Sequence, residues 1–395
     1  MQILVFIVGI LLFIGLVLVH EWGHFIMARR NGVDVEEFGL GFPPRAWGKK
    51  LKSGMMLSLN WLPLGGFVKL KGENDSDTRK GSLGAASLGA KTKIMLAGVT
   101  MNLLAGLFIL TILALIGMPK LLTQDNVGQD QFTVASDTKV IRQEVLTGAV
   151  QPGSPAAKIG LRGTDQLISV SNGAQTRQFN TPEQIHAATL VFAGQKVKLT
   201  YKRSGHILTS NVQLLSKNVV QASLKTNDPK GYLGIVPTSL QIQRSTWSAP
   251  VVAVGLTKQI VALTFQGLGH AFAGLGSAIA GLVTNNHQAR TNGQSQASSQ
   301  VGGPVAIGVA LWDYGYLGIN FMLFLIALIS LTLALMNVLP IPALDGGRLT
   351  MMLVSRGIFR RPLARATEEW IVGASFFLIL ALVALITVVD VKRFF

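Results

Sequence analysis

Two histidines and a glutamate near the N-terminus have the types and spacing for metal chemistry. His20 and His24 lie four residues apart, and Glu21 directly follows the first of them. At about 3.6 residues per turn, both imidazoles project from the same side of a helix, about one turn apart. This spacing lets two imidazoles bind one Zn²⁺, with Glu21 close enough to act on a water at the metal.

A third ligand is predicted far along the chain, in the stretch Asn337-Val-Leu-Pro340-Ile-Pro342-Ala-Leu-Asp345. The two prolines break a helix, so the backbone near Asp345 is irregular at membrane depth, which is tolerated only beside protein or a water-filled cavity. An Asp-Gly step is usually a turn, but an aspartate after a long uncharged run is better explained as a ligand. The chain has no cysteine, so only His, Asp or Glu can hold the metal.

The composition indicates an integral membrane protein. Of 395 residues, 49% are hydrophobic and 14% are charged, whereas charged residues usually make up about 25%. The net charge of +16 could suggest a nucleic-acid partner, but the basic residues are spread out. We therefore expect no nucleic acid and attribute the basic residues to membrane orientation.

Four apolar runs are predicted to span the bilayer: 1–27, 94–118, 317–339 and 370–389. No Lys or Arg precedes the first run and no small-residue cleavage site follows it. Cleavage would also discard both histidines, so we expect this run to be retained rather than removed as a signal peptide.

The positions of the basic residues predict the orientation of the spans. Residues 29–93 carry twelve Lys or Arg against six Asp or Glu, and 346–369 carry five arginines. Both segments are therefore placed in the cytoplasm, with the two termini outside. If 251–283 also crossed once, Asp345 would lie about 30 Å from the histidines. That segment is apolar yet contains Lys258, Gln259, Gln266 and His270, so it could span or lie along the membrane surface. If Asp345 is a ligand, the segment must lie on the membrane or double back.

Two short alternating runs, Met55–Leu59 and Gly65–Lys71, predict a β-hairpin over 55–71 with its turn near Pro63. The hairpin could be a plain surface feature. It could instead dip to the active site and offer an open edge to an extended peptide.

In the second span, Gly98 and Asn102 share one helix face. They could serve close helix packing and an ordinary interhelical hydrogen bond. They could equally have a role near the metal.

Residues 119–240 are polar and mixed, with β-type runs at 140–145, 166–170, 197–201, 208–214 and 232–236. A helix is predicted over Thr181–Phe192, with Thr181 as N-cap. The run Gly153–Leu161, followed by Asp165–Val170, resembles the PDZ signature, which implies capture of peptide termini by strand addition. Another small β module is the alternative. Residues 284–300 are polar and of low complexity, and we expect a mobile loop there.

The ordered set of motifs resembles the bacterial site-2 proteases, in their four-span form with one PDZ domain. The resemblance rests on five motifs: His20-Glu21-x-x-His24, Gly65-Gly66-Phe67-Val68-Lys69, Gly98-x-x-x-Asn102, Gly303-Pro304 and Asn337-x-x-Pro340-x-x-x-x-Asp345-Gly346. The family's Gly-Pro-x-x-Asn reads Gly98-Val-Thr-Met-Asn102 here, so the second span departs from the pattern.

The resemblance implies that Zn²⁺ is bound by His20, His24 and Asp345 and that Glu21 is the catalytic base. It also assigns substrate contacts to the residues Gly65, Gly66, Phe67, Asn102, Asn337 and Pro340. The expected location is the bacterial inner membrane, with the PDZ domain extracytoplasmic and the site near the cytoplasmic face.

The sequence thus predicts an α-helical polytopic membrane protein with four transmembrane helices, a membrane-associated β-hairpin and an inserted extracytoplasmic α+β PDZ domain. Its parts are 1–118, 119–240 (PDZ), 241–316 (surface helix and loop) and 317–395. The predicted function is cleavage within transmembrane segments of substrates already trimmed outside, such as an anti-sigma factor or signal-peptide remnants. A non-catalytic membrane PDZ scaffold is the alternative. A zinc transporter is disfavoured because spans two and four have almost no polar residues.

Overall fold

The computed structural model describes residues 2–123, 127–226, 228–284, 286, 288, 291–292, 303–314 and 317–394. Most of the loop expected over 284–300 therefore lies outside the described residues. The chain forms two compact units. One comprises Met1–Gln2, Leu113–Val252 and Asp313–Phe321, and the other comprises Ile3–Ile112, Ala253–Trp312 and Met322–Phe395.

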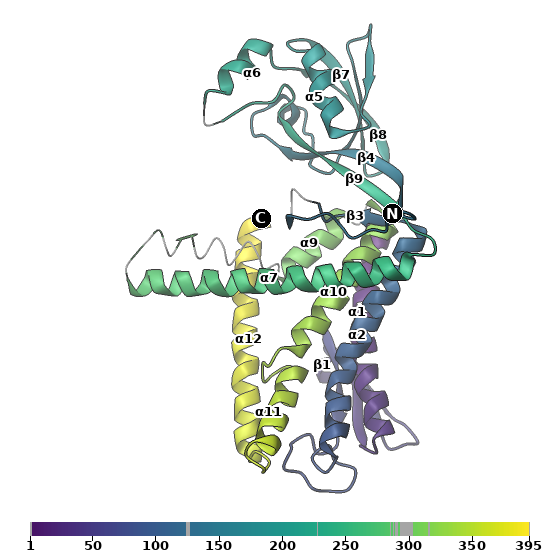
Figure 1. Cartoon of the computed structure of the whole chain (residues 1–395), viewed down its shortest axis with the longest axis vertical. Helices are drawn as coiled ribbons and strands as arrows, with labels where there is room; N and C mark the ends of the chain where they lie inside the picture. The colour runs from purple at the N-terminus through teal and green to yellow at the C-terminus, as the bar shows by residue number, and fades with distance from the viewer. Residues whose placement is uncertain are drawn as a thin grey trace. The chain divides into compact units, whose positions relative to one another are not determined.

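The second unit is mainly helical, which confirms the apolar helices expected from the sequence. Its long helices are α1 (Gln2–Arg30), α2 (Leu88–Ile116), α7 (Ala249–Val283), α10 (Ile319–Val338) and α12 (Arg365–Phe394), with the shorter α9 (Pro304–Tyr314) and α11 (Asp345–Gly357). Among the described residues, five helices are long and apolar enough to cross a membrane, and one of the five is Ala249–Ala278 in α7. The expectation named four spans and placed this segment on the surface, and length and composition alone do not separate the two arrangements. In Figure 1, α7 runs across α10 and α12 rather than along them.

Small residues let these helices approach one another closely. A Cβ added at Gly23 of α1 would lie 2.6 Å from the Ala97 carbonyl oxygen of α2. A Cβ at Gly106 of α2 would lie 2.7 Å from the Leu331 side chain of α10. Apolar helices in lipid gain little from hydrophobic burial, so such close backbone packing is what holds them together.

The residues between α1 and α2 form a small sheet of β1 (Val35–Lys50) and β2 (Met56–Leu70). The predicted strands 55–59 and 65–71 lie almost entirely within the single strand β2, so the predicted turn near Pro63 and the pairing of the two with each other were wrong. Residues 37–40 of β1 pair with 66–69 on one side and with 56–59 on the other. A strand has two edges, so the inserted segment separates the two predicted partners. Glycines at 39 and 41 hide the alternation of this segment in the sequence.

The first unit contains a larger sheet with the order β3-β9-β4-β5-β7-β8, and β6 pairs with β5. The strands are β3 (Met118–Lys120), β4 (Lys139–Val150), β5 (Gln166–Ser171), β6 (Thr176–Gln178), β7 (Lys196–Arg203), β8 (His206–Gln213) and β9 (Ile235–Arg244). The runs predicted at 140–145, 166–170, 197–201 and 208–214 are confirmed as strands. The run 232–236 was wrong in its bounds, because β9 begins at Ile235.

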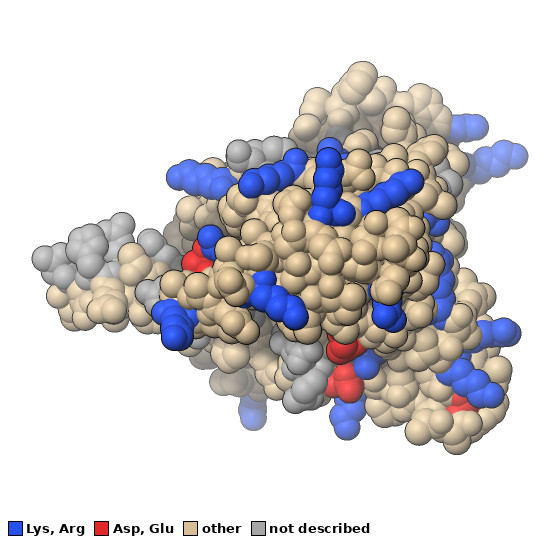
Figure 2. All heavy atoms as spheres, turned by 90° about the horizontal axis from the view of Figure 1, so that it is seen from above, with Lys and Arg blue, Asp and Glu red and all other residues tan. Residues whose placement is uncertain are grey.

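Three helices accompany this sheet: α4 (Pro155–Lys158), α5 (Pro182–Val191) and α6 (Lys217–Ser223). The helix predicted over 181–192 is confirmed as α5, with Thr181 at its N-cap. Its inner side chains join a core with alternate residues of β7, including Val197, Leu199 and Tyr201. On the face seen in Figure 2, Lys and Arg side chains project outward and acidic side chains are few. Such charge fits a surface in contact with water rather than with lipid tails.

Candidate metal centre

The C-terminal part of α1 places both histidines on one side of the helix, as the four-residue spacing requires. His20 is 8% exposed and His24 is 7% exposed. Histidines are rarely this buried in an apolar helix without partners, so the groups around each ring determine what they can do.

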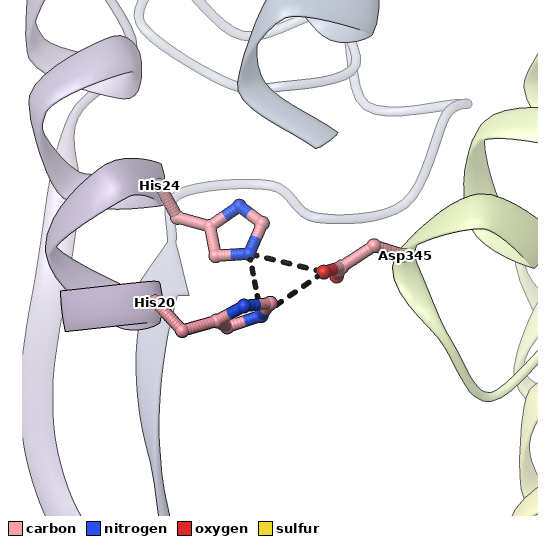
Figure 3. Close-up of side chains that lie close together, drawn as sticks. All are labelled: His20, His24 and Asp345. Atoms are coloured by element: carbon pink, nitrogen blue, oxygen red, sulfur yellow. Dashed lines mark hydrogen bonds and ion pairs between the residues drawn. The ribbon is translucent and has the colours of Figure 1, made fainter. Parts of the chain in front are cut away.

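The three predicted ligands lie together (Figure 3). Nε2 of His20 lies 3.2 Å from Nε2 of His24. Oδ2 of Asp345 lies 3.1 Å from both of these nitrogens. Zinc bonds of about 2.0–2.1 Å in a tetrahedral site place neighbouring ligand atoms about 3.3 Å apart. The triangle of ligand atoms therefore has nearly the dimensions that a Zn²⁺ ion requires.

Both histidines are held through their other ring nitrogens by α2. Nδ1 of His24 donates to the Ile94 carbonyl oxygen at 2.8 Å. Nδ1 of His20 lies 3.2 Å from the Asn102 amide nitrogen. Hydrogen bonds of this kind orient metal-ligating imidazoles and select the tautomer that leaves Nε2 free.

The amide of Asn102 supplies a second indication that the pocket fits a metal. Asn102 is 1% exposed, and its Oδ1 is buried without a hydrogen-bond partner. The oxygen and nitrogen of an amide exchange places when the group turns over. In that orientation Oδ1 accepts from Nδ1–H of His20. This contact removes the unpaired oxygen and leaves the Nε2 lone pair free for the ion.

Asp345 is the first residue of α11 and reaches the histidines because the chain turns tightly just before it. A Cβ at Gly346 or Gly347 would collide with the backbone of residues 338–341, so only glycine fits at these positions. Burial tends to raise the pKa of the Asp345 carboxyl. Its contacts with the His20 and His24 rings outweigh burial and hold that pKa well below its ordinary value. Asp345 is therefore a carboxylate, as a metal ligand must be.

Gly98 of α2 lies directly against both imidazoles. A Cβ added at Gly98 would lie 2.5 Å from Cε1 and 2.7 Å from Nε2 of His20, and closer still to Nε2 of His24. In the sequence, Gly98 is distinguished only by sharing a helix face with Asn102. The close approach itself is visible only in three dimensions.

Glu21 points from α1 toward the β1–β2 sheet. A Cβ at Gly66 would lie 3.3 Å from Cγ of Glu21, and the Val68 backbone N–H is hydrogen-bonded to the Glu21 carboxylate. Glu21 is also within electrostatic range of His20, His24 and Asp345. The predicted base therefore lies between the ligand cluster and the strand 66–70.

None of the side-chain contacts described for the other predicted substrate residues is with His20, His24 or Asp345. Asn337 lies in the last turn of α10, and Pro340 is exposed and lines a cavity of about 190 Å³. Gly65 faces the Phe42 ring, and the Phe67 ring packs over Gly39. A larger cavity of about 440 Å³ between α11 and α12 is lined by Arg348 and Glu368, among others, and neither cavity is lined by His20 or His24.

Comparison with known proteins agrees with this geometry. A profile of Peptidase family M50 matches residues 8–382. A candidate zinc metalloprotease of Clostridium perfringens is 29% identical over 97% of both chains. Similar candidate zinc metalloproteases are found in Clostridium acetobutylicum, at 27% identity over 98% of this chain and 96% of the relative, and in Nostoc, at 29% identity over 93% and 90%.

The family profile covers both halves of the ligand set, the end of α1 and the start of α11, and the relatives align along almost the whole chain. The family is zinc-dependent, and its members are metalloproteases. The chain is therefore a multi-pass membrane metalloprotease and belongs to Peptidase family M50, the site-2 protease family.

Proposed function

We propose that this protein is an intramembrane zinc protease that hydrolyses a peptide bond within the transmembrane segment of its substrate. The observation that carries the proposal is the triangle formed by His20, His24 and Asp345. Two of these ligands end an apolar helix, Ile3–Arg30, and the third follows another, Ile319–Val338. A metal held there lies beside lipid, where soluble peptides are scarce and membrane segments are the available substrates.

His20, His24 and Asp345 are the residues that would hold Zn²⁺. When bound, the ion supplies a Lewis acid that polarises the scissile carbonyl and lowers the pKa of a water molecule. Glu21 accepts a proton from the attacking water and then delivers it to the leaving amine. Asn102 keeps the His20 ring oriented for this role, and we favour that function for Asn102 over the substrate contact expected from the sequence.

The substrate is proposed to bind as an added strand on residues 66–70. Among the described residues, strand 66–70 pairs only with 35–40, so its other edge has no strand partner. A transmembrane helix must unwind before its peptide bonds can be attacked, and each unpaired backbone group in lipid costs several kcal/mol. Pairing with this edge would offset that cost and would place the unwound backbone next to Glu21.

We further propose four spans, with α7 on the membrane surface. Figure 1 supports this arrangement, because α7 runs across α10 and α12. The parity of the crossings supports it as well. The cluster joins α1 to the start of α11, which follows α10, and the basic segments 29–93 and 346–369 then share the cytoplasmic side. The protein would thus lie in a bacterial inner membrane with both termini outside.

The sheet of the first unit is proposed to be an extracytoplasmic PDZ domain over residues 119–240, flanked by the membrane parts 1–118, 241–316 and 317–395. Ser154, within the run Gly153–Leu161 that resembles the PDZ signature, caps α4. The domain would dock peptide termini or exclude substrates not yet trimmed outside. Either role fits regulated proteolysis of an anti-sigma factor or clearance of signal-peptide remnants.

The test uses the full-length protein with Glu21→Gln, which keeps the ligand set and removes the base. We expect wild-type zinc content and loss of cleavage of a model transmembrane substrate. Glu36→Gln is the matched control, because Glu36 pairs only with exposed Lys69 among the ion pairs described, and it should cleave normally. Cleavage at the wild-type rate by Glu21→Gln would rule out the proposed mechanism. A chain without stoichiometric zinc would favour the PDZ scaffold instead.

A further inference from the structure

A buried aspartate in the loop before α2 joins the helices that carry the metal ligands and their partners. We propose that Asp75 is a positioning residue of the metal centre, which fixes α11 relative to α2 and so fixes Asp345 relative to the histidine pair. The inference rests on the proposed zinc site.

Asp75 contacts three helices at once. Its carboxylate accepts from Nζ of Lys91, in the first turn of α2. It also accepts from Nε of Arg356, in the last turn of α11, at 2.8 and 3.1 Å. Its backbone N–H donates to the carboxylate of Glu368, in the first turn of α12, at 3.0 Å.

The same two cations are joined a second time by a backbone group. The Gly84 carbonyl oxygen accepts from Nζ of Lys91 at 2.9 Å and from Nη2 of Arg356 at 3.3 Å. Arg356 Nη2 also donates to the Asp75 carbonyl oxygen at 2.7 Å. Lys91 is 0% exposed and Asp75 is 2% exposed, whereas the Arg356 side chain is 34% exposed, so the Lys91–Asp75 half of the network is buried and Arg356 reaches it from the surface.

Both arms of the network lead to the ligand cluster. Lys91 lies one helical turn before Ile94, whose carbonyl oxygen holds His24, and Gly98 and Asn102 follow on the same helix. Arg356 is eleven residues after Asp345 on α11, a rigid distance of about 16 Å. The same loop also contacts the first turn of α11, because Nη2 of Arg348 donates to the Glu73 carbonyl oxygen at 3.2 Å.

The charge of Asp75 is essential to this role. Lys91 is fully buried, and removing one partner of a buried pair leaves the other uncompensated. Loss of the Asp75 carboxylate would therefore destabilise Lys91 in its place and remove the charged link between Lys91 and the partly exposed Arg356. Metal sites tolerate ligand displacements of only about 0.2 Å, so a small shift of α11 would be felt at Asp345.

The test compares Asp75→Asn with Asp77→Asn in the full-length protein in nanodiscs. Asp77 is in the same loop, but its carboxylate pairs locally with Arg79, so its removal leaves the three helices joined. Arg356→Lys is a conservative second variant that keeps the charge and loses the fork-shaped donor. Each variant is titrated with Zn²⁺ against a chelator, loaded with Co²⁺ to record the visible spectrum of its ligand geometry, and assayed for kcat and KM.

We expect Asp75→Asn to raise the zinc dissociation constant about tenfold, in the range seen when outer partners of metal ligands are lost. Its Co²⁺ spectrum should change and kcat should fall with KM unchanged. Arg356→Lys should shift the same readouts less, and Asp77→Asn should match wild type.

A lower unfolding temperature with unchanged zinc affinity and an unchanged Co²⁺ spectrum would show that Asp75 is structural only, and would overturn the proposal. If Asp75→Asn does not yield folded protein, Arg356→Lys decides alone, and wild-type metal readouts in that variant overturn it. If wild-type protein itself binds no zinc through His20, the proposed function fails. That outcome differs from one in which wild type binds zinc and Asp75→Asn leaves the zinc affinity unchanged.

Discussion

Gly98→Ala is the substitution that most sharply tests the packing of the metal centre. The added Cβ would lie 2.5 and 2.7 Å from two atoms of the His20 ring. Ordinary contacts between such atoms are about 3.5 Å or longer, so the ring must move by about 0.8–1 Å. Zinc sites accept displacements of about 0.2 Å. We therefore expect the zinc dissociation constant to rise at least tenfold, or about 1.4 kcal/mol.

The effect on folding should be smaller and can be separated from the effect on zinc. Alanine in place of a helical glycine stabilises by about 0.5–1 kcal/mol, whereas overpacking costs about 1–3 kcal/mol. Two controls on α2 isolate these contributions. Gly89→Ala has no atom within 4 Å of its added Cβ, and Gly106→Ala meets only Leu331 side-chain atoms closer than 3 Å. Gly106→Ala therefore disturbs helix packing without touching the histidines.

The assay is chelator competition for Zn²⁺ on all three purified variants, together with cleavage of a model transmembrane substrate. We expect Gly89→Ala and Gly106→Ala to bind zinc like wild type, and only Gly98→Ala to lose affinity and activity. Wild-type zinc affinity in Gly98→Ala would refute the packing of both imidazoles against α2. Equal losses in Gly106→Ala would show that general helix packing, rather than the ring contact, controls the site.

Three further outcomes follow from the same structure. Asn102→Leu removes the partner of His20 Nδ1 and should raise the zinc dissociation constant about 10–100-fold in chelator competition, whereas an unchanged constant would leave Asn102 without a metal-supporting role. Because imidazoles bind metal only when neutral, acidification below about pH 6 should release zinc and abolish cleavage, and restoring both pH and Zn²⁺ should restore activity; zinc retained at pH 4.5 would speak against two histidine ligands. Asp137 accepts hydrogen bonds from Ser248 and Thr246, which hold the pKa of its carboxyl below the ordinary value. The Asp137 carboxylate should therefore stabilise the start of α7 above pH 4, and this stabilisation should be lost as the pH falls through the lowered pKa. Asp137→Asn should speed hydrogen exchange at residues 249–255 at pH 7. Equal exchange in the variant and in wild type would contradict this.

The candidate site could be predicted from the sequence because its residues are ionisable, and apolar helices rarely contain ionisable side chains. His20, His24 and Asp345 stand out against uncharged neighbours, and an arrangement of four spans places all three on the same side of the membrane. The structure brings these three together as expected.

The parts that escaped prediction depend on contacts between distant segments. The sequence around Gly98 does not indicate that two imidazoles pack against this residue. The sequence around Asp75 does not indicate which helices this residue contacts. The strand 35–40 was missed because glycines interrupt its alternation, and strand partners are set by long-range pairing rather than by local pattern. Its insertion between 56–59 and 66–69 changes which strand presents an open edge next to Glu21.

The most direct test of the central claim is zinc-edge X-ray absorption on the purified full-length protein. The structure predicts one zinc ion per chain, bound by two imidazole nitrogens and by oxygen ligands at about 2.0–2.1 Å. A chain without stoichiometric zinc, or a zinc ion with fewer than two imidazole ligands, would contradict a metal centre built from His20, His24 and Asp345.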